Sequence, residues 1–162
     1  MNEIYIIERK HTMKKNILLS LIVLCLVTLI SCTKNETVEI TLPFDESEIT
    51  AVEAYYYVAP SEATKKEITD SSDFSDIYSD VFKANVSTKE SEDVAGGETY
   101  CLKFYLSDST EYIIQYYNMG VKNGRIISSD FNYFTTSDLS GIFYGNYDYE
   151  ELSITETDLP VF

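Results

Sequence analysis

Apolar and polar residues alternate through most of the chain after residue 36, and this pattern predicts β-strands. Apolar side chains recur at every second position in the runs 37–42, 49–58, 98–106 and 111–118. Such a period of two is typical of strands with one buried face. Asn123-Gly124 is a strong turn signal before a short strand at 125–127, and FNYF at 131–134 is a candidate last strand.

One stretch has a helical period instead, from Ser72 to Ala84. Its apolar residues fall at i, i+3, i+4, i+7 and i+8, namely Phe74, Ile77, Tyr78, Val81 and Phe82. Asp70, Ser71 or Ser72 can cap its N-terminus. A helix of about 13 residues is too short to be stable alone, so its apolar stripe must pack on a sheet.

The remaining segments are polar. Residues 61–70 cross either as a loop or as a frayed strand, and 85–97 is interpreted as a loop. Strands joined by short turns indicate antiparallel pairing. We therefore expect an α+β fold in two layers, an antiparallel sheet of about five strands packed on one main helix.

The N-terminal region resembles a targeting signal. Met13-Lys14-Lys15-Asn16 precedes an apolar run from Ile17 to Ile30, which at 14 residues is shorter than the roughly 20 that a spanning helix needs. Leu29-Ile30-Ser31-Cys32 resembles the lipobox of bacterial lipoproteins. The resemblance implies cleavage before Cys32, lipid on its sulfur, and anchoring to the extracytoplasmic face of the cell membrane. The alternative is an uncleaved signal anchor in which Cys32 is incidental.

Residues 1–12 suit a signal poorly because they contain two acids and four bulky apolar residues, so we expect translation to start at Met13. The expected organisation has four parts: a signal peptide at 1–31, the lipidated cysteine and tether at 32–37, one α+β domain at 38–146, and an acidic tail at 147–162.

Cleavage before Cys32 removes residues that common catalytic and metal sites require. His11 is the only histidine and leaves with the signal, which excludes Ser-His-Asp and Cys-His catalysis and zinc held by histidine. Cys25 leaves too and Cys32 carries lipid, so Cys101 has no intrachain partner and is expected to be a small buried apolar residue. No cofactor and no metal site is predicted.

The charge of the mature chain disfavours polyanionic partners. The formal net charge is −15, and cleavage leaves 25 of the 27 acids and 8 of the 12 bases, which gives −17. Nucleic-acid binding requires clustered Lys and Arg, so it is disfavoured. Anionic headgroups would repel the domain, so the lipid itself must anchor it.

Tyrosine supplies the candidate binding face. Thirteen of the 14 tyrosines follow the cleavage site, and the chain has no tryptophan. Four of them project opposite the expected core residues of their strands: Tyr55, Tyr57, Tyr105 and Tyr117. A tyrosine offers a rigid apolar face with a polar tip, which suits a sugar or a peptide. The alternative is that they are ordinary half-buried strand residues.

The carboxylates are a weaker candidate. One cluster lies at the N-terminal end and along one side of the predicted helix: Asp70, Asp73, Asp76 and Asp80. A second cluster lies at 147–151. Neither cluster has the D-x-D-x-D-G spacing of a calcium loop. Both clusters are interpreted as solvated surface. Arg125 can bind an anionic group or form a surface ion pair.

VSTKESED (86–93) followed by YCLKFYLSDSTEYIIQYY (100–117) resembles a family of small Firmicutes lipoproteins grouped as a domain of unknown function. These proteins share a capped amphipathic helix, a similar loop and an aromatic hairpin. The likeness spans roughly 48–145, but FNYFTTSDLSGIFYG departs from the family's ending, which is richer in Pro and Gln. The resemblance implies a bacterial group and a fold, and no activity.

The leading hypothesis is a non-catalytic, lipid-anchored surface module that binds a protein or cell-wall partner. The alternative is a structural or accessory envelope domain without a ligand, and the third is a small hydrolase that uses carboxylates.

Overall fold

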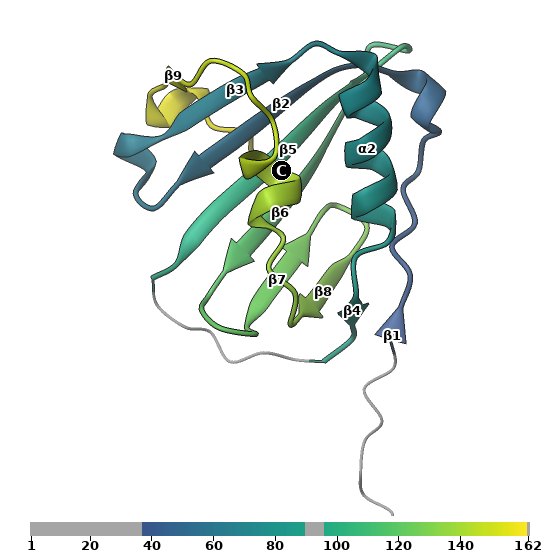
Figure 1. The fold of residues 1–162 in the computed structure, drawn as a ribbon, viewed down its shortest axis with the longest axis vertical. Helices are drawn as coiled ribbons and strands as arrows, with labels where there is room; N and C mark the ends of the chain where they lie inside the picture. The colour runs from purple at the N-terminus through teal and green to yellow at the C-terminus, as the bar shows by residue number, and fades with distance from the viewer. Residues whose placement is uncertain (1–36, 90–95, 162) are drawn as a thin grey trace, which may run out of the picture. The chain divides into compact units, whose positions relative to one another are not determined.

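The computed structural model describes residues 37–89 and 96–161 (Figure 1). The chain divides into two units, 1–34 and 35–162, and all described residues belong to the second. The expected signal peptide, the lipobox Leu29-Ile30-Ser31, Cys32 and most of the tether therefore lie outside the described residues. Within the described part, no helix is long and apolar enough to cross a membrane.

The described residues form a nine-stranded sheet in which all neighbouring strands are antiparallel. The strands are β1 (Thr37–Val38), β2 (Ile49–Tyr57), β3 (Thr64–Ile68), β4 (Val86–Ser87), β5 (Glu98–Leu106), β6 (Glu111–Asn118), β7 (Gly124–Ile127), β8 (Asn132–Thr135) and β9 (Leu152–Ser153). Their order across the sheet is β1-β4-β8-β7-β6-β5-β2-β3-β9. The one α-helix of the described part is α2 (Ser71–Phe82), accompanied by 3₁₀ turns at Glu46–Glu48, Pro60–Glu62 and Glu156–Asp158 and a π turn at Gly141–Gly145.

The prediction of an α+β fold with about five strands on one helix is wrong, because residues 37–89 and 96–161 form a nine-stranded sheet with a single α-helix. Strands β4 and β9 have two residues each, which is too short for alternation to register in the sequence. The sequence of β3, TKKEI, is polar and does not show the alternation typical of a strand. It carries two lysines, one of which is buried. The predicted strand at 37–42 is paired only at Thr37–Val38.

Helix α2 begins one residue before the predicted start and ends two residues before the predicted end. Asp70 caps it, since its Oδ1 accepts a hydrogen bond from the Ser72 backbone N–H at 2.9 Å. Phe74, Ile77 and Val81 are buried, so most of the predicted stripe faces the sheet, whereas Phe82, its last member, is exposed. Asp70 is exposed, and the bonds from Ser72 hold the pKa of its carboxyl below the ordinary value.

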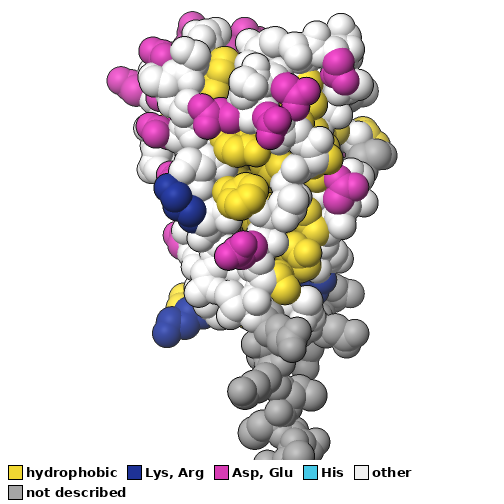
Figure 2. Space-filling view, turned by 90° about the vertical axis from the view of Figure 1, so that its right-hand side faces the viewer, with side chains coloured by type: hydrophobic (Ala, Val, Ile, Leu, Met, Phe, Trp, Pro, Cys, Tyr) yellow, Lys and Arg dark blue, Asp and Glu magenta, His cyan; other side chains and the backbone are white. Residues whose placement is uncertain are grey.

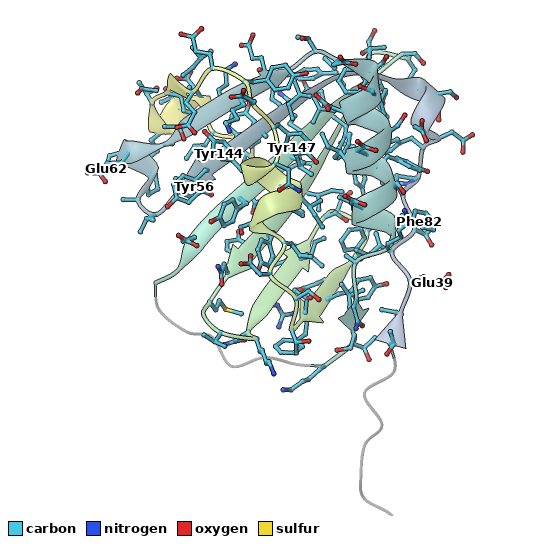
Figure 3. The ribbon with its side chains drawn as sticks, viewed as in Figure 1. Glu39, Tyr56, Glu62, Phe82, Tyr144 and Tyr147 are labelled. Carbon is cyan, nitrogen blue, oxygen red and sulfur yellow. The ribbon has the colours of Figure 1, made fainter. Side chains whose placement is uncertain are left out.

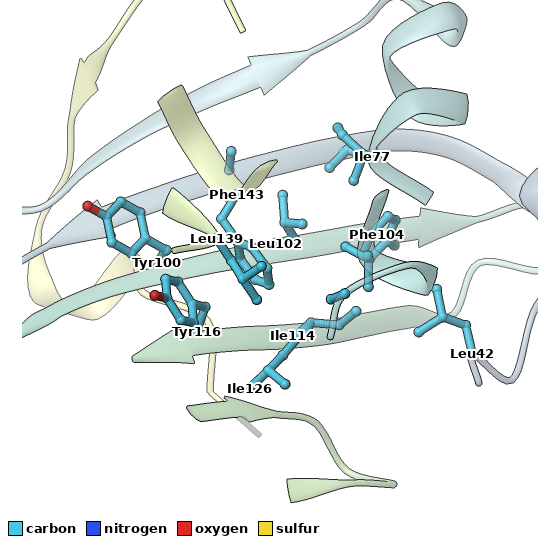
Figure 4. Close-up of a cluster of buried hydrophobic side chains, with 14 of the residues drawn as sticks. Leu42, Ile77, Tyr100, Leu102, Phe104, Ile114, Tyr116, Ile126, Leu139 and Phe143 are labelled. Atoms are coloured by element: carbon cyan, nitrogen blue, oxygen red, sulfur yellow. The ribbon is translucent and has the colours of Figure 1, made fainter. Parts of the chain in front are cut away.

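Cross-strand register divides the sheet into two faces. Even-numbered residues of the central strands face α2, as in the row Ala54–Leu102–Ile114, and we call this side the helix face. Odd-numbered residues, as in the row Tyr55–Cys101–Gln115, lie on the other side, which we call the open face. Figure 4 shows the helix-face core, whose labelled members are Leu42, Ile77, Tyr100, Leu102, Phe104, Ile114, Tyr116, Ile126, Leu139 and Phe143.

The C-terminal segment also packs on the helix face, beside α2 (Figure 1). Phe143, Tyr144 and Tyr147 are buried there, and Figure 3 labels the last two. Tyr149 donates its hydroxyl hydrogen to Asp73 Oδ2 at 2.7 Å. The first part of the expected acidic tail, from residue 147, is thus joined to the helix, and β9 extends the sheet.

Candidate functional site

All four candidate tyrosines lie on the open face. Tyr55 pairs with Cys101, and Tyr57 and Tyr117 flank Thr99 from the two neighbouring strands. Their exposure differs, however: Tyr55 is only 3% exposed, whereas Tyr57, Tyr105 and Tyr117 are half-buried. The four therefore share a face without forming one exposed patch.

Glu53 occupies the centre of one half of this face. Its Oε2 accepts hydrogen bonds from the hydroxyls of Tyr55 and Tyr105, both at 2.6 Å, and its Oε1 lies 2.6 Å from the Lys65 ammonium. Burial alone would raise the pKa of Glu53, but the bonds from Lys65 and the two tyrosines outweigh it and lower the pKa. The hydroxyls of Tyr55 and Tyr105 are thus committed to an internal network.

A groove occupies the other half of the open face. Its volume is about 610 Å³, which falls within the range of small-ligand sites. The groove is lined by Val58, Gly96, Gly97, Glu98, Thr99, Tyr117, Asn118, Met119, Arg125, Ile127 and Asn132. Of the four candidate tyrosines, only Tyr117 contributes to it.

Hydrogen bonds fix the polar groups of the groove. Arg125 donates from Nε to Asn132 Oδ1 at 3.0 Å, and Nη2 donates to the same oxygen. Asn118 donates from Nδ2 to Glu98 Oε2 at 3.1 Å. Gly97, at φ +132°, brings its backbone so close to Asn118 that a Cβ would lie 2.6 Å from the carbonyl oxygen. The groove is therefore preorganised and mixed in polarity.

Cys101 lies at the middle of the open face between Tyr55 and Gln115 and is fully buried. Burial raises the pKa of its thiol well above the ordinary value. A buried thiol with a raised pKa is a poor nucleophile, in agreement with the interpretation of Cys101 as an apolar residue.

Charge on the domain is unevenly distributed. The described residues include 21 Asp and Glu against 7 Lys and Arg. Figure 2 shows the acids gathered mainly in the upper half of the face that carries α2, with Lys and Arg lower down. Lys65, Lys66 and Lys103 each lie within 4 Å of a carboxylate. In residues 37–89 and 96–161, no three His, Cys, Asp or Glu side chains converge on a possible metal site.

Several residues of these sites were not recognised from the sequence. Glu53 and Lys65 organise the network, and Asn118 and Asn132 supply the polar walls of the groove. A signal for Glu53 exists, since it lies two residues before Tyr55 and so shares its face. Nothing in the sequence brings Asn132 to Arg125, because that contact depends on the register of β7 and β8.

Comparison of the chain with models of protein families, with curated proteins and with solved structures gives no match. The resemblance to Firmicutes lipoproteins stays a prediction.

Proposed function

We propose that this protein is a lipid-anchored, non-catalytic surface module whose open-face groove binds a glycan strand of the cell wall. The groove around Tyr117 is the observation that carries the proposal. A glycan presents apolar C–H faces edged by hydroxyl groups. Tyr117 offers a half-exposed ring for such a face, while Arg125 and Asn132 offer planar polar groups beside it.

The lipobox resemblance supports the anchoring half of the proposal. Thr37, the first described residue of β1, follows Cys32 by five positions. Five residues span at most about 18 Å. Lipid on Cys32 would therefore hold the edge of the sheet close to the bilayer, where a Gram-positive wall begins.

Binding to isolated cell-wall sacculi tests the groove. In the full-length lipidated protein, Tyr117→Ala should lower the affinity about tenfold or more, because the aromatic platform is lost. Tyr117→Phe keeps the ring and should bind within about twofold of the parent. Val121→Ala, an exposed change outside the groove lining, is the surface control. Equal binding by the parent and Tyr117→Ala would overturn the glycan assignment.

Fractionation of cells tests the anchor separately. Cys32→Ala should release the protein from the membrane, because the thiol that carries the lipid is lost. Retention of that variant with an uncleaved signal would instead establish a plain signal anchor, and would leave the wall-binding result unaffected.

One observation favours the alternative of a structural or accessory domain without a ligand. Half of the open face is occupied by the hydrogen-bond network around Glu53, in which the hydroxyls of Tyr55 and Tyr105 bond within the protein. If neither sacculi nor their soluble glycan fragments bind the folded protein, this alternative replaces the binding module.

A further inference from the structure

A second, aromatic pocket lies on the helix face, where the π turn at Gly141–Gly145 meets the sheet. Its volume is about 390 Å³. The lining residues are Tyr56, Tyr100, Ser140, Gly141, Tyr144, Gly145, Asn146 and Glu151. None of them lines the groove of the open face.

Three tyrosine rings from distant parts of the chain form the pocket wall. Tyr56 and Tyr100 are cross-strand partners, with ring centroids 5.1 Å apart. Tyr144 arrives from the C-terminal segment, with its ring 5.8 Å from that of Tyr56, and Figure 3 labels both. Gly141 and Gly145 also line the pocket, and they add no side chain to fill it.

Carboxylates border these rings. Glu98 accepts hydrogen bonds from the Tyr100 hydroxyl at 2.9 Å and the Tyr56 hydroxyl at 3.4 Å. Glu151 lines the pocket directly. The π-faces of the rings are electron-rich and the neighbouring oxygens are negative, so the pocket has the electrostatic character of a cation site.

The protein already places one cation against this aromatic cluster. The Lys66 ammonium lies 4.5 Å from the centroid of the Tyr144 ring. It is also 3.7 Å from a carboxylate oxygen of Glu151 and bonds to two main-chain carbonyls. With Lys66, Glu98 and Glu151 counted together, the surroundings of the pocket keep a net charge of −1, so a second cation is still favoured.

We propose that the Tyr56–Tyr100–Tyr144 pocket binds an organic ammonium ion, of the quaternary ammonium class. A metal ion fits less well, because the lining contains three tyrosine rings but only one carboxylate, Glu151, whereas hard cations need several oxygen ligands. A bulky ammonium ion instead carries a diffuse charge on an apolar surface, which matches aromatic rings edged by carboxylates. The pocket and the proposed glycan groove share the neighbouring carboxylate Glu98, which also accepts a hydrogen bond from Asn118, but they have no lining residue in common. The pocket does not depend on the anchor.

Choline and its uncharged isostere 3,3-dimethylbutan-1-ol have the same shape but differ in charge, so a comparison of their affinities isolates the effect of the charge. Both are titrated into the full-length protein and followed by NMR chemical shifts of the tyrosine rings. Choline should bind at least about tenfold more tightly than the isostere, since only choline gains the cation–π and carboxylate attraction. Equal affinity for the two probes, or no saturable shift with choline, overturns the proposal.

Adjacent residues of β2 provide matched variants. Tyr56→Leu should weaken choline binding about fivefold or more, and Glu151→Gln should weaken it by a smaller factor. Tyr57→Leu alters the next residue, on the open face, and should leave choline affinity unchanged. If Tyr56→Leu fails to fold, Tyr56→Phe, which keeps the ring, should bind within about twofold of the parent while Glu151→Gln still weakens binding. Equal effects of Tyr56→Leu and Tyr57→Leu, or no effect of Glu151→Gln, would contradict the assignment.

Discussion

Lys66 directs its ammonium nitrogen at the main-chain carbonyl oxygen of Tyr147, 2.8 Å away. The same nitrogen lies 3.3 Å from the carbonyl oxygen of Tyr144, and the lysine is only 7% exposed. A charged group from β3 thus holds the C-terminal segment against the sheet.

Lys66→Met should release that segment. Methionine keeps the apolar stem but leaves the two buried carbonyls without their donor, which costs about 2 kcal/mol of unfolding free energy. Urea unfolding measures the loss, and limited proteolysis should cleave the variant faster within residues 147–160. Lys83→Met, at the exposed C-cap of α2, is the control and should leave both measurements within error. Unchanged cleavage of Lys66→Met would show that the segment is held without it.

Glu53→Gln should destabilise the open face. The amide keeps the shape of the side chain but removes the charge that accepts bonds from Tyr55, Tyr105 and Lys65. We expect a loss of about 2 kcal/mol at pH 7, measured by urea unfolding. Glu67→Gln removes a more exposed partner of Lys65 and should cost less than about 0.5 kcal/mol.

The Glu53 effect should depend on pH in a defined direction. The pKa of Glu53 is lower in the folded protein than its ordinary value of 4.5. Its contribution to stability is therefore complete above that value and is lost as the pH falls through the lower, folded-state pKa. The stability difference between the parent and Glu53→Gln should shrink on acidification below pH 4.5, and a constant difference would contradict the network.

Tyr112 should make stability fall at alkaline pH. Burial raises its pKa to about 12, and the hydrogen bond to Asp130, at 2.8 Å, acts in the same direction. Its contribution is complete below the unfolded pKa of about 10 and is lost as the pH rises towards 12. Tyr112→Phe should flatten the decline in urea midpoint above pH 10. An unchanged slope would mean that Tyr112 ionises normally.

Cys101 should react with alkylating reagents only when the sheet opens. Mass spectrometry of the peptide that contains Cys101 should show labelling of the native full-length protein at least about 1,000-fold more slowly than of the urea-denatured chain. The rate should rise with the denaturant concentration. Rapid labelling of the folded protein would contradict the burial of this thiol.

Gly124 should tolerate no side chain. A Cβ there would lie 2.7 Å from Cε2 of the Tyr116 ring, so Gly124→Ala must displace that ring, at a cost of about 1–3 kcal/mol. Gly145→Ala is the matched control, because its Cβ would meet nothing closer than 3.7 Å. Thermal unfolding compares the two, and equal midpoints would show that the Tyr116 ring can move freely.

The longer elements could be predicted from the sequence because their patterns extend over many residues. Alternation located β2, β5 and β6, and the helical stripe located α2. The sequence nonetheless predicts too few strands. Strands β1, β4 and β9 each pair with a neighbouring strand through only two residue pairs, and that pairing depends on tertiary contact. β3 was ambiguous because Lys66 places an apolar stem inside the domain while its charge binds carbonyl groups.

For the candidate site, the sequence could predict which face of the sheet the four tyrosines occupy, but not how exposed their side chains are. Alternation alone places Tyr55, Tyr57, Tyr105 and Tyr117 on one side of their strands. Which of them remain accessible depends on neighbours that only register brings together, such as Glu53 beside Tyr105. The Tyr56 pocket could not be anticipated, because Tyr144 reaches it from 88 positions away.

The first and last strands of the described chain, β1 and β9, occupy opposite edges of the sheet. A mechanical load between an anchored N-terminal end and a glycan held in the groove at Tyr117 would enter at β1 and pass through β4, β8 and β7 to β6, and β9, at the opposite edge, lies outside this path. The load would meet the two-residue pairing of β1 with β4 before the four-residue ladder between β7 and β6. The β1 edge would peel first under tension, and the eight-residue ladder between β5 and β6 would keep its arrangement until that edge had parted.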